Sequence, residues 1–269
     1  SDDINKDGKI DKTYYFRGVV NNNVLFANLC WKAVKISEDG AVKLIYNGVP
    51  YYGKCYGYNS YIDSSYYETI DYANEEDSHV KKIVDDWYRE TLLQYNEYIQ
   101  DTPYCNDRSK DENGEYNSKN RLSGNTKNPT SKCNNEDSFT VSDKIGNGKL
   151  KYPVGLLTAD EYIYSGGSTT FIKKTKPLVS LNKTVKSNIL RIESGTSNDG
   201  NISTSTYLLG DYWTMTPIQN NSVYKVDPNG LYAENVSGEN ETYSHVVPVI
   251  SLNEKSIVLY GNGSASKPY

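Results

Sequence analysis

Several common site signatures are missing from this sequence. It contains only two histidines, His79 and His245, so a three-histidine metal site is impossible, and we expect both to be structural or surface residues. No C-x-x-C pair occurs, which argues against a zinc knuckle or a thioredoxin-like site. The P-loop, Rossmann and G-x-S-x-G motifs are absent as well. We therefore expect a protein that is not an enzyme.

Long apolar runs and an excess of positive charge are also lacking. No run approaches the 18 residues or so that a membrane helix needs, and no signal peptide is visible. The net charge of −5 makes the chain as a whole a poor match for nucleic acid or an anionic membrane. We expect no membrane contact by this fragment. Its first residues read as the start of a trimmed chain, so an N-terminal anchor or pilin helix would lie outside it.

Tyrosine, by contrast, is abundant, with 26 Tyr against four Phe and three Trp. Surfaces rich in Tyr, Asn and Ser are typical of adaptable binding sites. The competing explanation is codon usage, because Lys, Asn, Ile and Tyr share A/T-rich codons. From the sequence alone we favour codon usage and keep a binding surface as the alternative.

The four cysteines, Cys30, Cys55, Cys105 and Cys133, are an even number. They predict two disulfides and hence an exported protein, with zinc binding and free buried thiols as alternatives. Of the three connectivities we choose the sequence-local one, which joins Cys30 to Cys55 and Cys105 to Cys133. The second bridge would close the polar region 101–136, and the loop-entropy estimate for it is ~3 to 4 kcal/mol.

Residues 1–13 reproduce most of a calcium-binding loop. The oxygen-bearing and polar positions alternate as such a loop requires: Asp3, Asn5, Asp7, Lys9 and Asp11. Tyr14 stands where the bidentate acid belongs, which spoils the pattern. We interpret 1–13 as a polar linker, with a weak calcium site as the alternative, and expect no other cofactor.

The remainder predicts an α+β fold with antiparallel sheets, two helices and long polar loops. Strands are expected between Tyr14 and Tyr46. One helix is expected from an N-cap at Asp77 or Ser78 to about Tyr98, because its apolar residues recur at helical spacing.

A second, short helix is predicted by the pair Thr158 and Glu161, which has the spacing of a capping box. Gly166 and Gly167 would end this helix. Its start also accounts for the neighbouring acids, so we do not assign them to catalysis.

The stretch 212–252 predicts an antiparallel meander. Three runs of β-branched and aromatic residues are separated by turn-forming residues. The central runs, 222–226 and 231–236, flank a four-residue turn that contains Pro228 and Gly230. Pro248 lies inside the last run, so we expect either an edge strand or a bulge there.

The order of several short segments resembles a C-type-lectin-like domain of the formylglycine-generating-enzyme-like subclass, as found on Gram-positive surface proteins and minor type IV pilins. The segments are YYFRG from Tyr14, the region around Cys30-Trp31, CNDR from Cys105, YPVGLLTADEYIYSGG from Tyr152, YWTMTP from Tyr212 and VPVISL from Val247. The likeness implies a single domain over 14–269 with its two ends brought together by strands.

Two departures limit what the resemblance implies. The enzymes of this subclass use a reactive cysteine pair late in the domain, whereas all four cysteines here precede residue 134. Relatives commonly carry arginine where this chain has Val247. The scaffold therefore carries over and the catalytic feature does not.

From these features we expect a non-catalytic adhesion module at the cell surface or on a pilus. This module would be the exposed head of a minor type IV pilin or of another anchored adhesin. Its partners would be other pilus subunits and a surface ligand that is a glycan, a protein or extracellular DNA. The alternatives are a structural pilus subunit without a ligand and a DNA binder. The candidate ligand-binding residues form a basic group: Lys173, Lys174, Lys176, Lys183, Lys186 and Arg191.

Overall fold

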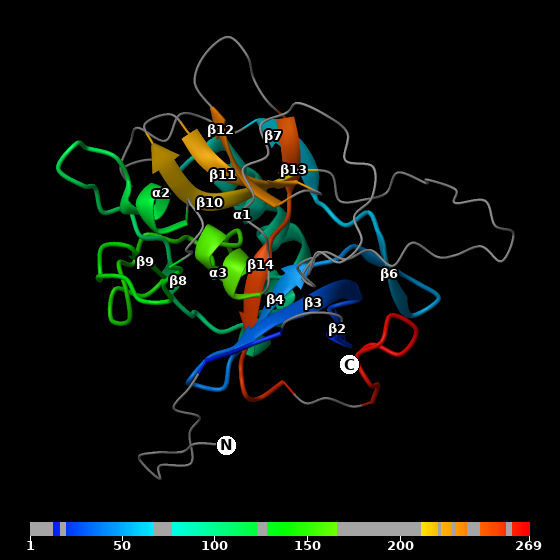
Figure 1. Ribbon diagram of the computed structural model, residues 1–269. Coiled ribbons are helices and arrows are strands. Elements are labelled where there is room, and N and C mark those ends of the chain that lie inside the picture. Colours follow the sequence, from blue (N-terminus) through cyan, green and yellow to red (C-terminus); the bar gives the residue numbers. More distant parts are fainter. Residues whose placement is uncertain are drawn as a thin grey trace, which may run out of the picture.

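Two five-stranded sheets form the framework of the computed structural model (Figure 1). The structure describes residues 13–16, 20–66, 77–122, 128–165, 211–219, 222–227, 230–235, 243–256 and 260–269. The predicted α+β class with mostly antiparallel sheets is confirmed.

The first sheet has the strand order β1-β3-β4-β14, and β2 also pairs with β3. Its strands are β1 (Tyr14–Tyr15), β2 (Asn23–Phe26), β3 (Leu29–Ile36), β4 (Val42–Tyr46) and β14 (Val249–Leu252). All pairs in this sheet are antiparallel. Trp31 is fully buried and, with its neighbour Cys30, belongs to the core.

The second sheet has the order β12-β11-β10-β13-β7. Its strands are β7 (Asp63–Tyr66), β10 (Tyr212–Gln219), β11 (Ser222–Asp227), β12 (Gly230–Asn235) and β13 (Tyr243–Val246). The hairpin of β11 and β12 confirms the central part of the predicted meander.

The last run of that meander departs from the prediction. The chain leaves the second sheet after Val246 and enters the first sheet at Val249. Pro248 lies between the two strands, where its missing N–H interrupts no ladder and its carbonyl accepts from the Tyr46 amide at 2.9 Å. In addition, β13 pairs with β10 in parallel, at Tyr212 and His245. One continuous apolar run therefore serves both sheets.

The helices are α1 (His79–Thr91), η1 (Leu93–Tyr98), α2 (Asn117–Leu122) and α3 (Ala159–Tyr164). Ser78 caps α1, and Thr158 and Glu161 form the predicted capping box of α3. The expected single helix to Tyr98 is wrong in one respect, since the chain tightens into the 3₁₀ helix η1 after α1 ends. The expectation of two helices also missed α2. Within the described ranges no helix is long and apolar enough to cross a membrane.

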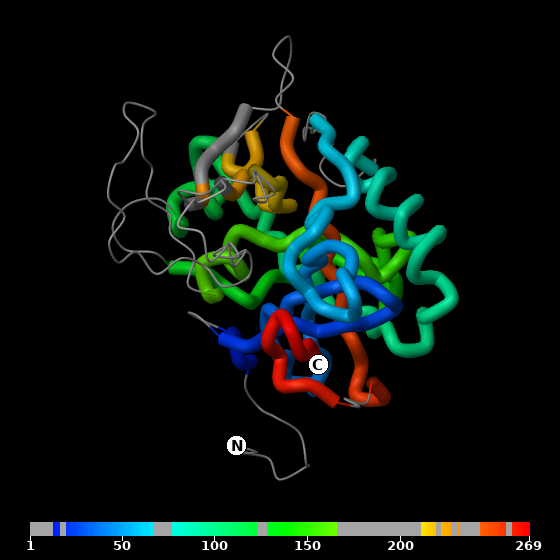
Figure 2. Tube along the Cα trace, turned by 90° about the vertical axis from the view of Figure 1, so that its right-hand side faces the viewer, coloured from blue at the N-terminus to red at the C-terminus, as the bar shows by residue number. Residues whose placement is uncertain are grey.

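The C-terminal segment packs beside the strands at the beginning of the described chain, as Figure 2 shows in red and blue. The Tyr269 amide donates to the Asn23 carbonyl at 2.9 Å, and the Leu25 amide donates to the Tyr269 carbonyl at 2.7 Å. These bonds extend the β2 edge of the first sheet. Cys30 of β3 is bonded to Cys55 of the hairpin formed by β5 (Val49–Tyr51) and β6 (Lys54–Tyr58), which confirms the first predicted disulfide.

A buried ion cluster joins the first sheet to α3. Glu161 Oε1 lies 2.8 Å from Lys43 Nζ of β4 and 2.9 Å from Lys35 Nζ of β3. Burial alone would raise the pKa of Glu161, but the two ammonium groups lower it to about 2. Burial in turn lowers the pKa of Lys43 to about 8. The Lys43 ammonium also lies 4.2 Å from the centre of the Tyr104 ring.

We predict that this cluster contributes to acid sensitivity. The carboxyl of Glu161 titrates at about 2 when folded and near its ordinary 4.5 when unfolded, so its contribution is complete above pH 5 and is lost as the pH falls. Between pH 5 and pH 3 this loss is roughly 2 kcal/mol. Glu161→Gln should lower the free energy of unfolding at pH 7 by about 3–5 kcal/mol, because it removes the anion that both lysines share. Urea unfolding at the three pH values measures both effects.

The matched control is Glu115→Gln, which removes a carboxylate from a surface ion pair with Lys119. We expect a change below about 1 kcal/mol for that variant. If Glu161→Gln lost as much stability as the unmodified protein between pH 5 and pH 3, Glu161 would not be the titrating group.

Candidate functional site

The described residues of the polar region 101–136, which lacks apolar periodicity, are 101–122 and 128–136, and they fold around the second disulfide. Cys105 and Cys133 are bonded, with their Cα atoms 5.5 Å apart, so the second predicted pairing is also confirmed. Cys105 belongs to β8 (Tyr104–Cys105), which pairs with β9 (Ser138–Phe139) just beyond the bridge. We call the described residues 105–122 and 128–137 the bridged loop.

Arg121 of α2 fixes the bridged loop to the body of the protein. Its guanidinium bonds both oxygens of Asp160 on α3 and lies 3.0 Å from Asp107 Oδ2. Although burial alone would lower the pKa of Arg121, its bonds with the two carboxylates raise it. Asp160 also accepts the Thr130 amide at 2.7 Å, and Tyr164 Oη donates to the Pro129 carbonyl at 2.7 Å. Both Arg121 and the segment 129–130 are thus tied to α3.

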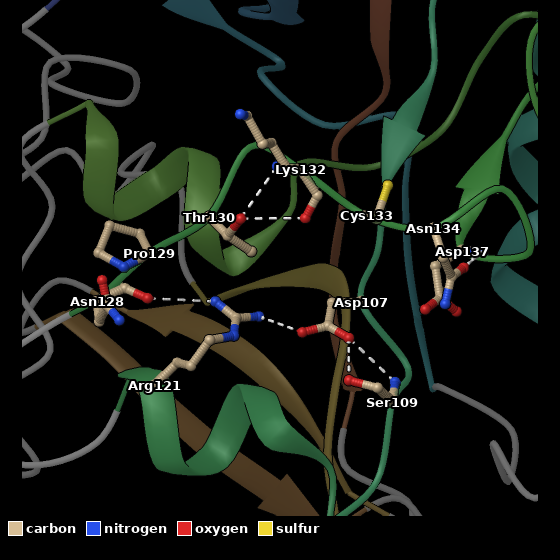
Figure 3. Close-up of a pocket in the computed structure, with 10 residues that line it drawn as sticks. All are labelled: Asp107, Ser109, Arg121, Asn128, Pro129, Thr130, Lys132, Cys133, Asn134 and Asp137. Atoms are coloured by element: carbon tan, nitrogen blue, oxygen red, sulfur yellow. Dashed lines mark hydrogen bonds and ion pairs between the residues drawn. The ribbon is translucent and has the colours of Figure 1, made fainter.

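A pocket of about 450 Å³ opens in this loop. Figure 3 shows Arg121 reaching from α2 toward Asp107 on one side, with Thr130 and Lys132 on another. The lining is almost wholly polar: Asp107, Ser109, Arg121, Asn128, Pro129, Thr130, Lys132, Cys133, Asn134 and Asp137.

The pocket's hydrogen-bonding groups are held by local turns. The Ser109 amide donates to Asp107 Oδ1 at 3.1 Å, and the Asp137 amide donates to Asn134 Oδ1 at 2.8 Å. Thr130 Oγ1 both donates to the Lys132 carbonyl and accepts the Lys132 amide, each at 3.0 Å. Burial raises the pKa of Asp137. Carboxylates, amides and hydroxyls held in this way can recognise a ligand that both donates and accepts hydrogen bonds.

Catalytic roles receive no support from this geometry. Asp107 and Asp160 flank the guanidinium of Arg121 and serve as its counter-ions. Among the described residues, no group of three His, Cys, Asp or Glu side chains is placed to hold a metal ion. His79 lies at the start of α1 and stacks on Tyr66, and His245 lies in β13 and stacks on Tyr61.

Two of the predicted sites fall outside the described residues. The candidate calcium loop, with Asp3, Asn5, Asp7, Lys9 and Asp11, lies in 1–12. The candidate basic ligand site, with Lys173, Lys174, Lys176, Lys183, Lys186 and Arg191, lies in 166–210. Both assignments stay predictions.

Sequence reasoning missed the pocket because its organising residue gives no local signal. Arg121 reads as one of several cations in a polar loop, and its partner Asp160 lies 39 positions away. Of the two carboxylate partners of Arg121, only Asp107 lies in the bridged loop. The cysteine pair was the one usable signal, since it implied that the loop has a fixed shape.

Comparison with family models, with curated proteins and with solved structures gives no match to this chain.

We predict that Arg121 is required for the shape of the bridged loop. Arg121→Met leaves Asp107 and Asp160 without their counter-ion. Because the Arg121 side chain is 18% exposed, we expect a loss of about 2–3 kcal/mol, which is less than breaking a fully buried pair costs. Hydrogen exchange should rise in residues 128–137, including the Thr130 amide, while β3 and β4 keep their protection. Exchange followed by mass spectrometry measures this.

Arg89→Met is the matched control, because Arg89 pairs with Asp86 and Glu90 on the exposed face of α1. Surface pairs of this kind contribute little, so exchange in 128–137 should not change. Equal exchange in this segment for Arg121→Met and the unmodified protein would show that the disulfide alone shapes the loop.

Proposed function

We propose that this chain is a non-catalytic binding module displayed outside the cell, as the exposed head of a minor type IV pilin or of another surface-anchored adhesin. The observation that carries the proposal is the construction of the bridged loop. A disulfide, a half-buried arginine with two carboxylates and backbone bonds to α3 together hold a polar pocket at the surface. Loops held rigid on a scaffold are where proteins commonly place recognition residues.

The fold supports the same proposal. Strands β1 to β4, the C-terminal segment against β2 and the sheet-joining run of β13 and β14 agree with a C-type-lectin-like scaffold. The two disulfides fit an oxidising location such as the cell surface. We include the C-type-lectin-like fold and the extracellular location in the proposal.

Beads coated with the purified chain test this function on mucus-producing epithelial monolayers. We expect the beads to adhere, and the double variant Asp137→Asn with Lys132→Ala to reduce adherence severalfold, because both residues line the pocket. The matched control carries Asp143→Asn with Lys144→Ala. These two residues are exposed close to the same loop and do not line the pocket.

Deletion of the protein in a piliated host separates the adhesin from a structural subunit. Pili that persist but no longer adhere support the proposal. A structural subunit without a ligand would be favoured by two results together. The pili would disappear on deletion, and coated beads would adhere no better than uncoated beads. Adherence that disappears as salt is raised and is competed by DNA would favour the polyanion alternative.

A further inference from the structure

Four exposed tyrosines form a continuous row on the hairpin of β5 and β6. Tyr51, Tyr52, Tyr56 and Tyr58 are 54%, 85%, 37% and 44% exposed, and we call them the tyrosine face. Ring centres are 4.5 Å apart for Tyr51 and Tyr52, 5.5 Å for Tyr51 and Tyr58, and 6.3 Å for Tyr56 and Tyr58. Each pair meets edge to face.

The alternation of β6 explains why these rings share one side. Lys54, Tyr56 and Tyr58 point outward, while Cys55 and Gly57 between them are buried. Across the hairpin, Tyr51 pairs with Lys54 and Val49 with Tyr58. The outward side of the hairpin is therefore almost entirely aromatic, with Lys54 as its one charge.

The body of the protein holds this hairpin rigidly. Cys55 is bonded to Cys30 of β3, and its amide donates to the Ala265 carbonyl at 2.8 Å. At the base of the hairpin, a Cβ on Gly48 would lie 1.9 Å from the Tyr58 carbonyl oxygen, so only glycine permits this close approach. The rings are thus presented by a fixed backbone.

Tyr52 occupies a turn position that suits another residue better. Tyr52 and Gly53 connect the two strands, and both have positive φ, 48° and 72°. This is the sign pattern of a type I′ turn, for which Asn-Gly is the preferred pair. A bulky side chain with positive φ is an outlier that costs free energy. The fold gains no burial in return, since the Tyr52 ring is the most exposed of the four.

Size and charge restrict what this face can bind. At about 200 Å² per ring, the exposures leave roughly 400–500 Å² of tyrosine surface, which is the size of a functional patch on a monomer. A stable protein complex buries about 800 Å² on each partner, so the face is too small for a protein interface of its own. A polyanion would require several cations, and among the described residues the hairpin of β5 and β6 contributes only Lys54 to this face.

We propose that the tyrosine face binds a neutral oligosaccharide. Sugar rings present apolar C–H faces that stack on exposed aromatic rings, while their hydroxyls can bond the phenolic oxygens at the ring edges. Rings that meet edge to face offer both kinds of contact along one row. This proposal rests on the proposed function, and it adds a ligand class and a site distinct from the pocket.

Saturation-transfer NMR on the full chain tests the proposal. The probes are cellotetraose, chitotetraose and laminaritetraose, with sialyllactose and a heparin tetrasaccharide as anionic comparators. We expect signal transfer to the C–H protons of at least one neutral tetrasaccharide and not to the anionic probes. Tyr58→Ala and Tyr52→Asn should each weaken that binding at least tenfold, as loss of an aromatic anchor does.

Two features of the variants keep the result interpretable. Tyr52→Asn should raise the melting temperature by about 2–4 °C, because asparagine suits the turn, so lost binding cannot be attributed to misfolding. Tyr14→Ala is the matched control, since Tyr14 is 42% exposed on β1 and lies outside the face. It should bind as the unmodified protein does.

The proposal would be overturned if no neutral probe bound, if only the anionic probes bound, or if Tyr52→Asn and Tyr58→Ala bound normally. Bead adherence distinguishes this failure from failure of the proposed function. One contrary result is that beads adhere equally with and without the two tyrosine substitutions, and another is that they adhere to periodate-treated monolayers as well as to untreated ones. Either result would be consistent with an adhesin and would indicate a protein ligand. Beads that do not adhere at all would contradict the adhesin itself.

Discussion

The rest of the structure depends on one buried anion. Glu161 is nearly inaccessible, yet it carries a charge that two lysines of the first sheet share. Its second oxygen accepts the Thr158 amide at 3.3 Å and completes the cap of α3. A buried charge that loses its partners costs several kcal/mol, so α3 has one place against β3 and β4. The adjoining residues then reach the second sheet, where the Ala159 amide donates to Thr216 Oγ1 at 3.0 Å.

The neighbouring acid extends this constraint to the candidate site. Asp160 and Glu161 are consecutive in the first turn of α3, and they point to different partners, one to Arg121 and the other to Lys43. One helical turn therefore fixes both the sheet and the bridged loop. Tyr104 connects the same two regions, because it lies against Lys43 and precedes the bridged Cys105. The shape of the pocket therefore depends on contacts between the bridged loop and the core.

Local features were predictable from the sequence, and long-range ones were not. The capping box, the Ser78 cap, the β11–β12 hairpin and both cysteine pairings involve residues close together in the chain. Pro248 was expected in an edge strand or at a bulge, but it lies between two strands, and nothing nearby in the sequence shows that β14 pairs with β4, some 200 positions earlier. Helix α2 is too short for helical periodicity to be visible. Asp160 and Glu161 were explained by the capping box alone, because their partners lie far away in sequence.

The tyrosine excess shows how the structure separates two explanations that composition cannot. Codon usage can raise the number of tyrosines, and many of them do serve the core, among them Tyr88, Tyr212 and Tyr224. At Tyr52, however, the turn favours asparagine, and asparagine shares the A/T-rich codons. Codon bias would therefore have supplied asparagine, which suits the turn, at least as readily as tyrosine. Tyr52 strains the backbone, buries little of its ring and continues a row of three other tyrosines. A binding role for the exposed ring explains these three features better than codon usage does.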